Sequence, residues 1–343
     1  MQYKLTEYSH GAGCGCKLSP GVLAEIIGVY GDVPEFPNLL VGNDTKDDAA
    51  VVSLDGKTAI VSTTDFFMPI VDDPVDFGAI SATNAISDVY AMGAEPIMAI
   101  AILGWPIDKI PGSVASEVMI GARTICAEAG IPLAGGHSID SPEPIFGLAV
   151  TGKVSVEHIK KNTDGKAGDL LYLTKPLGIG IVTTAQKKKL VEDKDLVTAK
   201  KSMTTLNKIG QELGKLNYVH ALTDVTGFGL GGHLLEVCDA GNVSATVHKE
   251  QLPVFDFVEK YLAKDCVPGG TNRNWKTYGE RISLVNEDDY KLIADPQTSG
   301  GLLVSIDPEN QANFEQYMST QGFDLKPIGA LRERNEGEVI EVV

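Results

Sequence analysis

The pattern of apolar and polar positions predicts strands that alternate with helices along the first half of the chain. Two alternating, β-branched runs, residues 50–54 and 58–63, flank Asp55-Gly56, which is typical of a tight β-hairpin. Small and apolar residues recur from about residue 77 to residue 92 and predict a helix, against which another backbone packs closely. The other elements expected here are a strand over 97–103, a helix over 114–129 ended by Gly130, and a strand over 145–150.

The second half repeats this style after a polar stretch, residues 157–169, which we interpret as a domain connector. Strands are expected over 170–173, 219–222, 301–306 and 339–343, and helices over 182–190, 195–216 and 227–240. Residues 1–47 show little periodicity beyond a short helical pattern near 20–30, and they are rich in Gly, Pro and Asn. This composition predicts a mobile N-terminal segment outside the core.

The order of these elements favours an α+β fold. Strands and helices interleave, but each half also contains a hairpin signal, so we predict two α+β sandwiches in preference to one doubly wound parallel sheet. A length of 343 residues suits two domains of ordinary size. The expected division is a mobile segment over 1–47, an N-terminal domain over 48–156 and a C-terminal domain over 157–343.

Charge and composition narrow the classes of function. The chain has 29 basic and 46 acidic residues, which give a net charge of −17. This charge argues against a nucleic-acid-binding protein, because phosphate backbones are bound by basic faces. The negative charge does not exclude a nucleotide-binding site, because a metal ion bound to carboxylates can hold a small anion. The longest uncharged apolar stretch, residues 96–107, is well short of the ~20 residues that a membrane helix needs. We therefore expect neither nucleic acid nor membrane as a partner.

The five cysteines argue against a disulfide framework, because their number is odd and the chain is long. A reducing cytoplasmic location is therefore expected, and the N-terminus also lacks the apolar core of a secretory signal. Cys126, Cys238 and Cys266 lie far apart and are expected to be buried small hydrophobes.

The segment at residues 10–17 reads His-Gly-Ala-Gly-Cys-Gly-Cys-Lys and is the most informative local feature. It resembles a Walker A loop in part, but Cys16 replaces the glycine before Lys17 and Leu18 replaces the magnesium-binding Ser or Thr. What remains is two exposed thiols on a flexible glycine scaffold beside a cation that favours the nucleophilic thiolate. Two such thiols are an oxidation liability without a use, so we favour a chemical role for Cys14 and Cys16 over an incidental turn.

A set of aspartates stands at strand ends or among small apolar residues. Its members are Asp47 and Asp48 before the first strand, Asp65 at the end of the next strand, Asp88 on the helix one turn after Asn84, and Asp224 after a later strand. A single carboxylate of this kind is usually a helix cap or a solvated residue. Several of them are harder to dismiss, because unpaired buried carboxylates are costly. Converging oxygen ligands without His or Cys favour Mg²⁺.

Two glycine-rich loops, residues 134–138 and 295–301, could present backbone N–H groups to phosphate. Each by itself is interpreted as an ordinary turn. His137 could equally be a satisfied polar group or an acid or base, and its pattern alone does not decide between them.

These motifs together make the chain resemble the selenophosphate synthetase (selenide, water dikinase) family along nearly its whole length. The resemblance is carried by HGAGCGCK at 10–17, DDAAV at 47–51, STTDFFMPIVDDPVDFG at 62–78, ATNAISDVYAMG at 82–93, AGGHSID at 134–140, TDVTGFGLGGH at 223–233 and DPQTSGG at 295–301. The first of these is highly specific to the family. The aspartates and glycine loops are shared with ATP-dependent enzymes that resemble aminoimidazole ribonucleotide synthetase.

The resemblance implies an ATP-dependent enzyme that makes selenophosphate, AMP and orthophosphate from selenide, ATP and water, with Mg²⁺ as cofactor. It also implies two α+β domains, a dimeric β-barrel formed by the N-terminal domains of a homodimer, and a C-terminal α/β sandwich. Cys14 matches the family's essential thiol, a position that some members fill with selenocysteine, and Lys17 matches its essential lysine.

The remaining site residues are implied in the same way. Asp48, Asp88 and Asp224 match the magnesium ligands. The matches to nucleotide contacts are Lys17, Thr45, Lys46, Asp47, Asp65, Asp88, Gly136, His137 and Ser138. Position 46 is often arginine in the family. The planar, two-pronged contact of a guanidinium is therefore replaced here by the single ammonium charge of Lys46. Whether Cys14 holds selenide or forms a persulfide-like intermediate stays open.

Two other functions are consistent with parts of the sequence. A sister ATP enzyme of the same fold would act on another small substrate and leave ADP, but the thiol–glycine–thiol–lysine segment speaks against it. A thiol carrier or metallochaperone would use Cys14 and Cys16 without catalysis, but it leaves the aspartates without a task.

Overall fold

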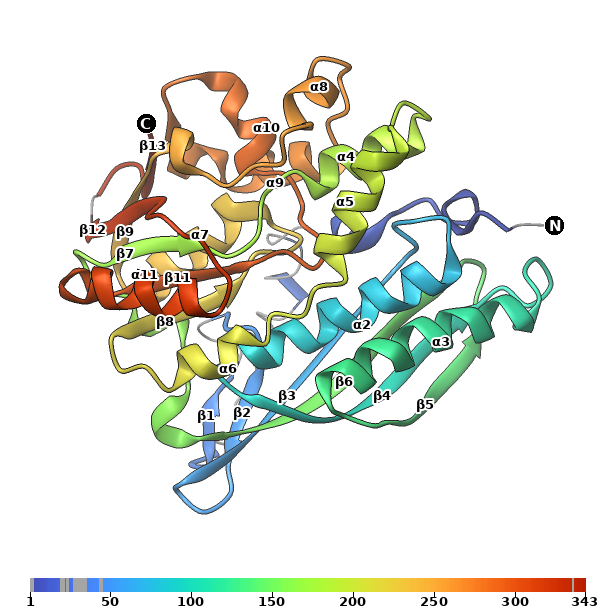
Figure 1. Cartoon of the computed structure of the whole chain (residues 1–343), viewed down its shortest axis with the longest axis horizontal. Coiled ribbons are helices and arrows are strands. Elements are labelled where there is room, and N and C mark those ends of the chain that lie inside the picture. Colours follow the sequence, from blue (N-terminus) through green and yellow to red (C-terminus); the bar gives the residue numbers. More distant parts are fainter. Residues whose placement is uncertain (1–2, 19–21, 23–24, 27–35, 43–45, 335) are drawn as a thin grey trace.

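Two mixed β-sheets, one from each half of the sequence, form the framework of the structure, which is a computed structural model (Figure 1). It describes residues 3–18, 22, 25–26, 36–42, 46–334 and 336–343. The first sheet has the order β1-β2-β3-β6-β4-β5, and only β4 and β5 run parallel. Its strands are β1 (Leu39–Val41), β2 (Ala50–Ser53), β3 (Thr58–Phe67), β4 (Glu95–Trp105), β5 (Leu133–Asp140) and β6 (Ile145–Ser155). Helices α2 (Pro74–Ala91) and α3 (Gly112–Ala129) lie together over one face of this sheet.

Local sequence explains why these elements form where they do. The expected β2–β3 hairpin forms, with Ala50 opposite Ser62, and the Asp55 side chain binds backbone N–H groups of the turn. Helix α3 ends at Gly130, whose φ of +77° suits a residue without a Cβ. The close backbone approach expected for the small-residue helix is confirmed, because a Cβ added to Gly78 would lie 1.9 Å from the Val118 carbonyl oxygen.

The second sheet has the order β10-β13-β9-β12-β7-β11-β8. Its strands are β7 (Leu170–Leu173), β8 (Val219–Asp224), β9 (Val243–Val247), β10 (Ile282–Leu284), β11 (Leu302–Ile306), β12 (Gly329–Glu333) and β13 (Ile340–Val342). The helices around it are α4 (Ile179–Lys187), α5 (Asp193–Met203), α6 (Ile209–Gly214), α7 (Gly229–Ala240), α8 (Val258–Leu262), α9 (Gly269–Tyr278), α10 (Tyr290–Ile293) and α11 (Gln311–Thr320). Alternate strand residues enter two different cores, one with α7 and one with α11. The sheet is therefore covered on both faces.

Several expectations for the secondary structure are wrong. The glycine-rich residues 134–138 are not a turn but belong to β5, which pairs with β4 along its length. The single helix expected over 195–216 is two helices, because Asn207 between them donates to Ser87 and to the Gly300 carbonyl. The expected connector does lie between the last strand of the first sheet and the first strand of the second, although its Lys160, Asn162 and Asp169 are hardly exposed. The helical pattern near 20–30 lies largely outside the described residues.

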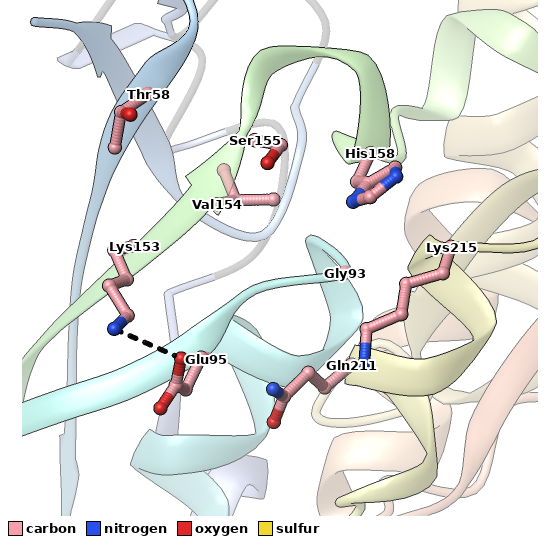
Figure 2. Close-up of a pocket in the computed structure, with 9 residues that line it drawn as sticks. All are labelled: Thr58, Gly93, Glu95, Lys153, Val154, Ser155, His158, Gln211 and Lys215. Carbon is pink, nitrogen blue, oxygen red and sulfur yellow. Dashed lines mark ion pairs between the residues drawn. The ribbon is translucent and has the colours of Figure 1, made fainter.

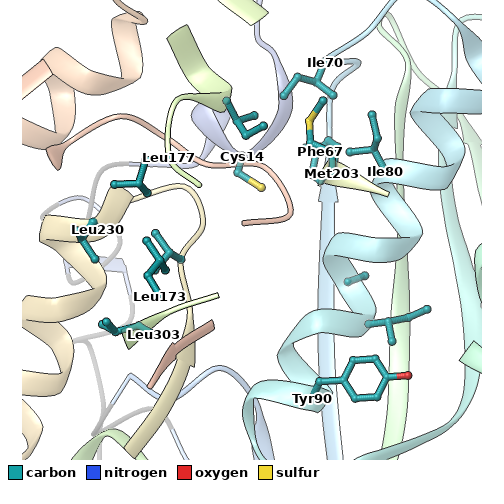
Figure 3. Packing of buried hydrophobic residues seen from close by; sticks show 14 of the residues in the cluster. Cys14, Phe67, Ile70, Ile80, Tyr90, Leu173, Leu177, Met203, Leu230 and Leu303 are labelled. Atoms are coloured by element: carbon teal, nitrogen blue, oxygen red, sulfur yellow. The ribbon is translucent and has the colours of Figure 1, made fainter. Parts of the chain in front are cut away.

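The N-terminal segment also contributes to the core, which corrects the expectation that it lies outside. Leu5 and Cys14 are 0% and 1% exposed, and Cys14 lies in the short 3₁₀ helix over Gly13–Cys16. Figure 3 shows Cys14 between apolar side chains of the two halves, with Ile70 and Leu177 among them. The cores of the two domains are thus continuous around this segment. Within the described parts of the chain, none of the helices combines the length and the apolarity needed to cross a membrane.

Candidate active site

Cys14 is held at the seam between the two domains by contacts on its backbone and on its thiol. Its N–H donates to Thr298 Oγ1 at 3.1 Å, and its Sγ donates to Asn84 Oδ1 at 3.2 Å. Asn84 comes from α2 of the first domain and Thr298 from the loop before β11 of the second. The expectation of an exposed thiol is therefore wrong for Cys14, because partners from both domains cover it. The side chain of Cys16 lies outside what the structure describes.

Lys17 lies close to Cys14 and forms an ion pair with Asp65. Its Nζ is 3.0 Å from Asp65 Oδ2, and the same oxygen accepts a hydrogen bond from Asn84 Nδ2 at 2.8 Å. The side chain of Lys17 is 37% exposed, and its partial burial lowers its pKa, but attraction to Asp65 and then to Cys14 more than reverses this, so the pKa ends well above its usual value. Lys17 is therefore a permanent cation beside the thiol.

The three aspartates expected to bind metal lie near one another, although they come from distant parts of the chain. Asp88 Oδ2 accepts a hydrogen bond from Thr63 Oγ1 at 2.5 Å, and Asp48 Oδ1 accepts one from Thr223 Oγ1 at 3.0 Å. Thr63 Oγ1 also lies 3.3 Å from the Asp48 carbonyl oxygen, so Thr63 connects Asp48 with Asp88. Asp224 follows directly after Thr223, at the end of β8.

The electrostatics of these carboxylates indicate a missing positive charge. Burial is the first cause of a raised pKa at Asp48, Asp88 and Asp224, and repulsion from Asp224 adds to it at the other two. The Oδ2 atoms of Asp48 and Asp224 are inaccessible to solvent and accept no hydrogen bond within the described residues. Such oxygens are costly unless a proton or a cation occupies them.

The cluster fits a metal that other ligands help to bind. Among the described residues, no three His, Cys, Asp or Glu side chains are already arranged around one metal position. The donors present are carboxylate oxygens, which suit Mg²⁺, and Mg²⁺ commonly keeps waters and substrate phosphates as further ligands. The carboxylates could therefore hold part of the coordination shell of a nucleotide-bound cation.

A pocket of about 530 Å³ opens beside Lys17 and Asp65. Its volume is within the range of small-molecule sites, and Phe66, Met68 and Phe228 give it an apolar wall. Figure 2 shows a different, smaller pocket, around the ion pair of Glu95 and Lys153 at the seam. Thr58 on its wall precedes Asp65 by seven residues of extended strand, so this pocket lies roughly 23 Å away along β3.

Three residues of the expected nucleotide set lie before β2. Thr45 is outside the described residues. Lys46 is exposed and has a φ of +54°, and its carbonyl accepts a hydrogen bond from Asn162 Nδ2. Asp47 Oδ1 accepts from the backbone N–H of Asn162 at 2.6 Å. The connector therefore anchors the loop that carries Asp48.

Gly136, His137 and Ser138 are not brought to the cluster within one chain. They lie on β5, the exposed edge strand, and pair with Ala101, Ile102 and Leu103 of β4. Strands β4 and β6 separate β5 from β3, which carries Asp65. At about 4.8 Å per strand, this places the triplet roughly 14 Å across the sheet from β3.

Sequence reasoning missed the hydroxyl side chains that hold the site. Thr63, Thr223 and Thr298 each bond directly to a candidate residue, but none was singled out. Two of them could have been found by position, because Thr63 lies two residues before Asp65 and Thr223 directly before Asp224. Thr298 could not, because 284 residues separate it from Cys14.

Comparison with known proteins agrees with this two-domain arrangement. The family model described as AIR synthase related protein, N-terminal domain, matches residues 46–154, and that of the C-terminal domain matches residues 166–342. The solved structure of AaThiL complexed with AMPPCP and TMP has a similar fold, with a TM-score of 0.67 and 20% identity over 95% of this chain and 93% of that one. The chain thus has the architecture of the AIR synthase related proteins.

Much closer relatives define its place within that group. The selenide, water dikinase of Pseudomonas putida is 56% identical over 340 residues, which cover 99% of this chain and 98% of the relative. The selenide, water dikinase of Aeromonas hydrophila is 56% identical over 342 residues, 99% of either chain. The chain therefore belongs to the selenide, water dikinase family.

Proposed function

We propose that this chain catalyses the ATP-dependent synthesis of selenophosphate from selenide and water, with AMP and orthophosphate as the other products. The observation that carries the proposal is the position of Cys14, which lies beside the Lys17–Asp65 ion pair at the seam where three carboxylates with raised pKa values approach one another. The relatives of the chain are named for the same activity. A nucleophile, a cation and a carboxylate cluster together suit phosphoryl transfer to a small anion.

The carboxylates would hold the divalent cation of the nucleotide. Asp48, Asp88 and Asp224 are the residues we assign to Mg²⁺, because two of them have buried oxygens without a partner among the described residues and all three have raised pKa values. Mg²⁺ bound there would neutralise polyphosphate charge. Two threonines support these carboxylates. Thr63 binds one oxygen of Asp88 and Thr223 binds one oxygen of Asp48, and in each aspartate the second oxygen stays available for the metal.

Lys17 and Cys14 would act on the transferred group and on selenide. Lys17 keeps its charge because Asp65 raises its pKa, so it can stabilise negative charge that develops on the γ-phosphoryl group. Asp65 orients that ammonium group and Asn84 orients the thiol, and a hydrogen bond joins Asn84 to Asp65. Burial of Cys14 keeps water from the thiol, which suits a first transfer in which selenide must replace water as the nucleophile. We assign the expected nucleotide contacts Thr45, Lys46 and Asp47 to the same site.

Phosphorus NMR under anaerobic conditions tests this function directly. With ATP, magnesium and selenide, the full chain is expected to form selenophosphate, AMP and orthophosphate in equal amounts, and no AMP without selenide. A final product of ADP would instead identify a sister enzyme of the same fold. Absence of magnesium-dependent nucleotide binding in a titration would favour a thiol carrier.

We also propose that two copies of the chain pair through the helix-free face of the first sheet and close a shared β-barrel. In one chain this sheet is open, and nearly all of β5 is exposed at its edge. An exposed edge of this length invites pairing with another strand. The helix-free face is also apolar, with Phe66, Met98 and Ile100 each more than 40% exposed. Pairing would let the Gly136–His137–Ser138 triplet serve the nucleotide site of the partner subunit.

Sedimentation of the full chain is expected to give a dimer of about 73 kDa, twice the 36.5 kDa of one chain, at micromolar concentration. Ile100→Asp places a charge on the helix-free face and is expected to yield monomers. Ile120→Asp is the matched control, because Ile120 is 55% exposed on the outer helix α3. A wild-type monomer, or equal dissociation by both substitutions, would contradict the proposed interface.

A further inference from the structure

Lys175 is a buried lysine to which the proposed chemistry gives no task. It lies two residues after β7, and its side chain is only 7% exposed. Its Nζ donates to the carbonyl oxygen of Thr205 at 2.7 Å and to that of Ser299 at 3.0 Å. Burial lowers the pKa of Lys175 to about 7, although attraction to Asp224 opposes this. A buried amine that bonds to backbone carbonyls is costly, and its two bonds hold the backbone at Thr205 and at Ser299.

Ser299, whose carbonyl Lys175 holds, has an unusual backbone conformation. Its φ is +53°, in the left-handed region that a residue with a Cβ adopts only where its surroundings fix it. Its N–H donates to Asn84 Oδ1 at 2.7 Å, so Ser299 is bonded on both sides. All three residues are buried, where hydrogen bonds are electrostatically stronger than in water. Lys175, together with Asn207 at the next carbonyl, thus holds the backbone that aims this N–H at α2 of the other domain.

Asn84 connects Ser299 to Cys14 and Asp65 through hydrogen bonds. Its Oδ1, which accepts the Ser299 N–H, also accepts the Cys14 thiol at 3.2 Å. Its Nδ2 donates to Asp65 Oδ2 at 2.8 Å, and that oxygen is 3.0 Å from Lys17 Nζ. An amide that is fixed at its oxygen cannot rotate without losing several bonds at once. The Ser299 N–H is therefore one of the bonds that orient Asn84 and, through Asn84, the thiol.

The neighbouring residue of the same loop adds a second point of contact. Thr298 Oγ1 accepts the N–H of Cys14 at 3.1 Å, and a Cβ added to Gly13 would lie 2.4 Å from that oxygen. The loop at residues 295–301 therefore touches both the backbone and, through Asn84, the side chain of Cys14. A small shift of the loop would displace both contacts together.

We propose that Lys175 is a positioning residue for the reaction of Cys14. It holds the loop at residues 295–301 in the conformation that orients Asn84 and, through Asn84, the thiol. The kinetic effect of this role rests on the proposed function, whereas its effect on the thiol does not. Lys175 itself contacts neither the thiol nor the carboxylates through a hydrogen bond.

The chain contains a matched control for this lysine. Lys160 is also 7% exposed, and its Nζ donates to two backbone carbonyls, those of Leu216 at 3.1 Å and Val219 at 2.7 Å. Burial lowers its pKa as well. None of its hydrogen bonds reaches the loop that contacts Cys14. Lys160→Met therefore also removes a buried ammonium group that donates to two backbone carbonyls, but at a different place in the fold.

The experiment compares the wild-type chain, Lys175→Met and Lys160→Met without substrates. Alkylation of each cysteine by iodoacetamide is followed by peptide mass spectrometry, and thermal unfolding reports on the fold. In Lys175→Met, alkylation of Cys14 is expected to be about tenfold faster, with Cys126 and Cys238 unchanged, because one local set of hydrogen bonds is lost. Lys160→Met is expected to leave the alkylation rate of Cys14 at the wild-type value.

Steady-state AMP formation gives the second readout. Lys175→Met is expected to lower kcat about tenfold and to leave the KM for ATP within about threefold, because it misplaces the thiol and leaves the nucleotide pocket intact. Lys175→Gln, whose amide can still donate to one carbonyl, is expected to lie between wild type and Lys175→Met in both readouts. Lys175→Gln also serves if the methionine variant does not fold.

Two results would overturn the proposal. One is a folded Lys175→Met or Lys175→Gln chain with wild-type alkylation of Cys14. The other is faster alkylation of all buried cysteines together, which would mean that Lys175 only stabilises the fold. If the wild-type chain formed no AMP with selenide, the proposed function would fail, but the alkylation contrast between the two lysines would still decide this inference.

Discussion

Replacing Cys14 with serine is expected to abolish selenide-dependent AMP formation, whereas replacing Cys16 with serine leaves substantial activity. Serine keeps the size and polarity of cysteine but is a far poorer nucleophile near neutral pH. Local chemistry treats the two thiols as equals, because Lys17 is close to both in sequence. The likeness to the family singles out Cys14, and the hydrogen bond of its thiol to Asn84 gives that position a defined environment.

The architecture of the site should survive the Cys14→Ser substitution. A serine hydroxyl can donate to Asn84 Oδ1 as the thiol does, and the backbone bond to Thr298 is unaffected. The carboxylates and the pocket beside Lys17 are also untouched. Magnesium-dependent ATP binding, measured by calorimetry, is therefore expected to stay within about threefold of wild type, while AMP formation falls at least about a thousandfold.

Cys16→Ser is the matched control, because it removes the neighbouring thiol of the same segment. Equal loss of activity in both variants would indicate a joint dithiol role and contradict the separate task of Cys14. Full activity in Cys14→Ser would remove the thiol from the mechanism.

Much of the fold follows from short-range patterns in the sequence, and its exceptions have physical reasons. The hairpin at Asp55-Gly56 and the helix with Asn84 and Asp88 one turn apart were predictable, because turn chemistry and helical periodicity act over a few residues. Strand β5 was missed because Gly135 and Gly136 suggest a turn and because its residues are exposed without alternation. Only pairing with β4, a tertiary contact, makes this segment a strand.

The candidate site shows the same division between local and distant information. The sequence alone selected Asp48, Asp88 and Asp224 by residue type and position, and the structure brings them near one another. It could not reveal that Cys14 is buried, because the covering residues Asn84 and Thr298 lie 70 and 284 positions away. The partners of Lys175 are equally remote, since a lysine in a polar-looking turn gives no local sign that it will be enclosed.

The carboxylate cluster leads to the other prediction with a large effect. Asp48→Asn is expected to stabilise the nucleotide-free chain slightly and to lower AMP formation at least about a hundredfold. An asparagine can keep the bond from Thr223, and its NH₂ group would replace the unpartnered Oδ2 of Asp48 with a donor toward the other carboxylates. Repulsion from Asp224 and Asp88 is relieved in the same step. The substitution lowers activity because the asparagine has lost the negative charge that a bound cation needs.

The pH dependence of stability follows from the direction of the pKa shifts. Asp48, Asp88 and Asp224 have pKa values raised above the ordinary 3.8, so above that pH the folded chain binds more protons than the unfolded chain. The free energy of unfolding therefore falls as the pH rises from 3.8 to the raised values. Magnesium competes with these protons, so its stabilising effect grows over the same range.

Thermal unfolding at a series of pH values from about 4 to about 8, with and without magnesium and a non-hydrolysable ATP analogue, measures these effects together. The wild-type chain is expected to gain more from magnesium and nucleotide as the pH rises, and Asp48→Asn is expected to lose most of that gain. Asp169→Asn is the control, because Asp169 is a buried carboxylate with its own partners, His220 and Ser305, away from the cluster. It is expected to lower the stability of the nucleotide-free chain and to keep the response to magnesium. A nucleotide-free Asp48→Asn chain that unfolds well below wild type and still gains stability from magnesium would show that Asp48 has a structural role and holds no metal.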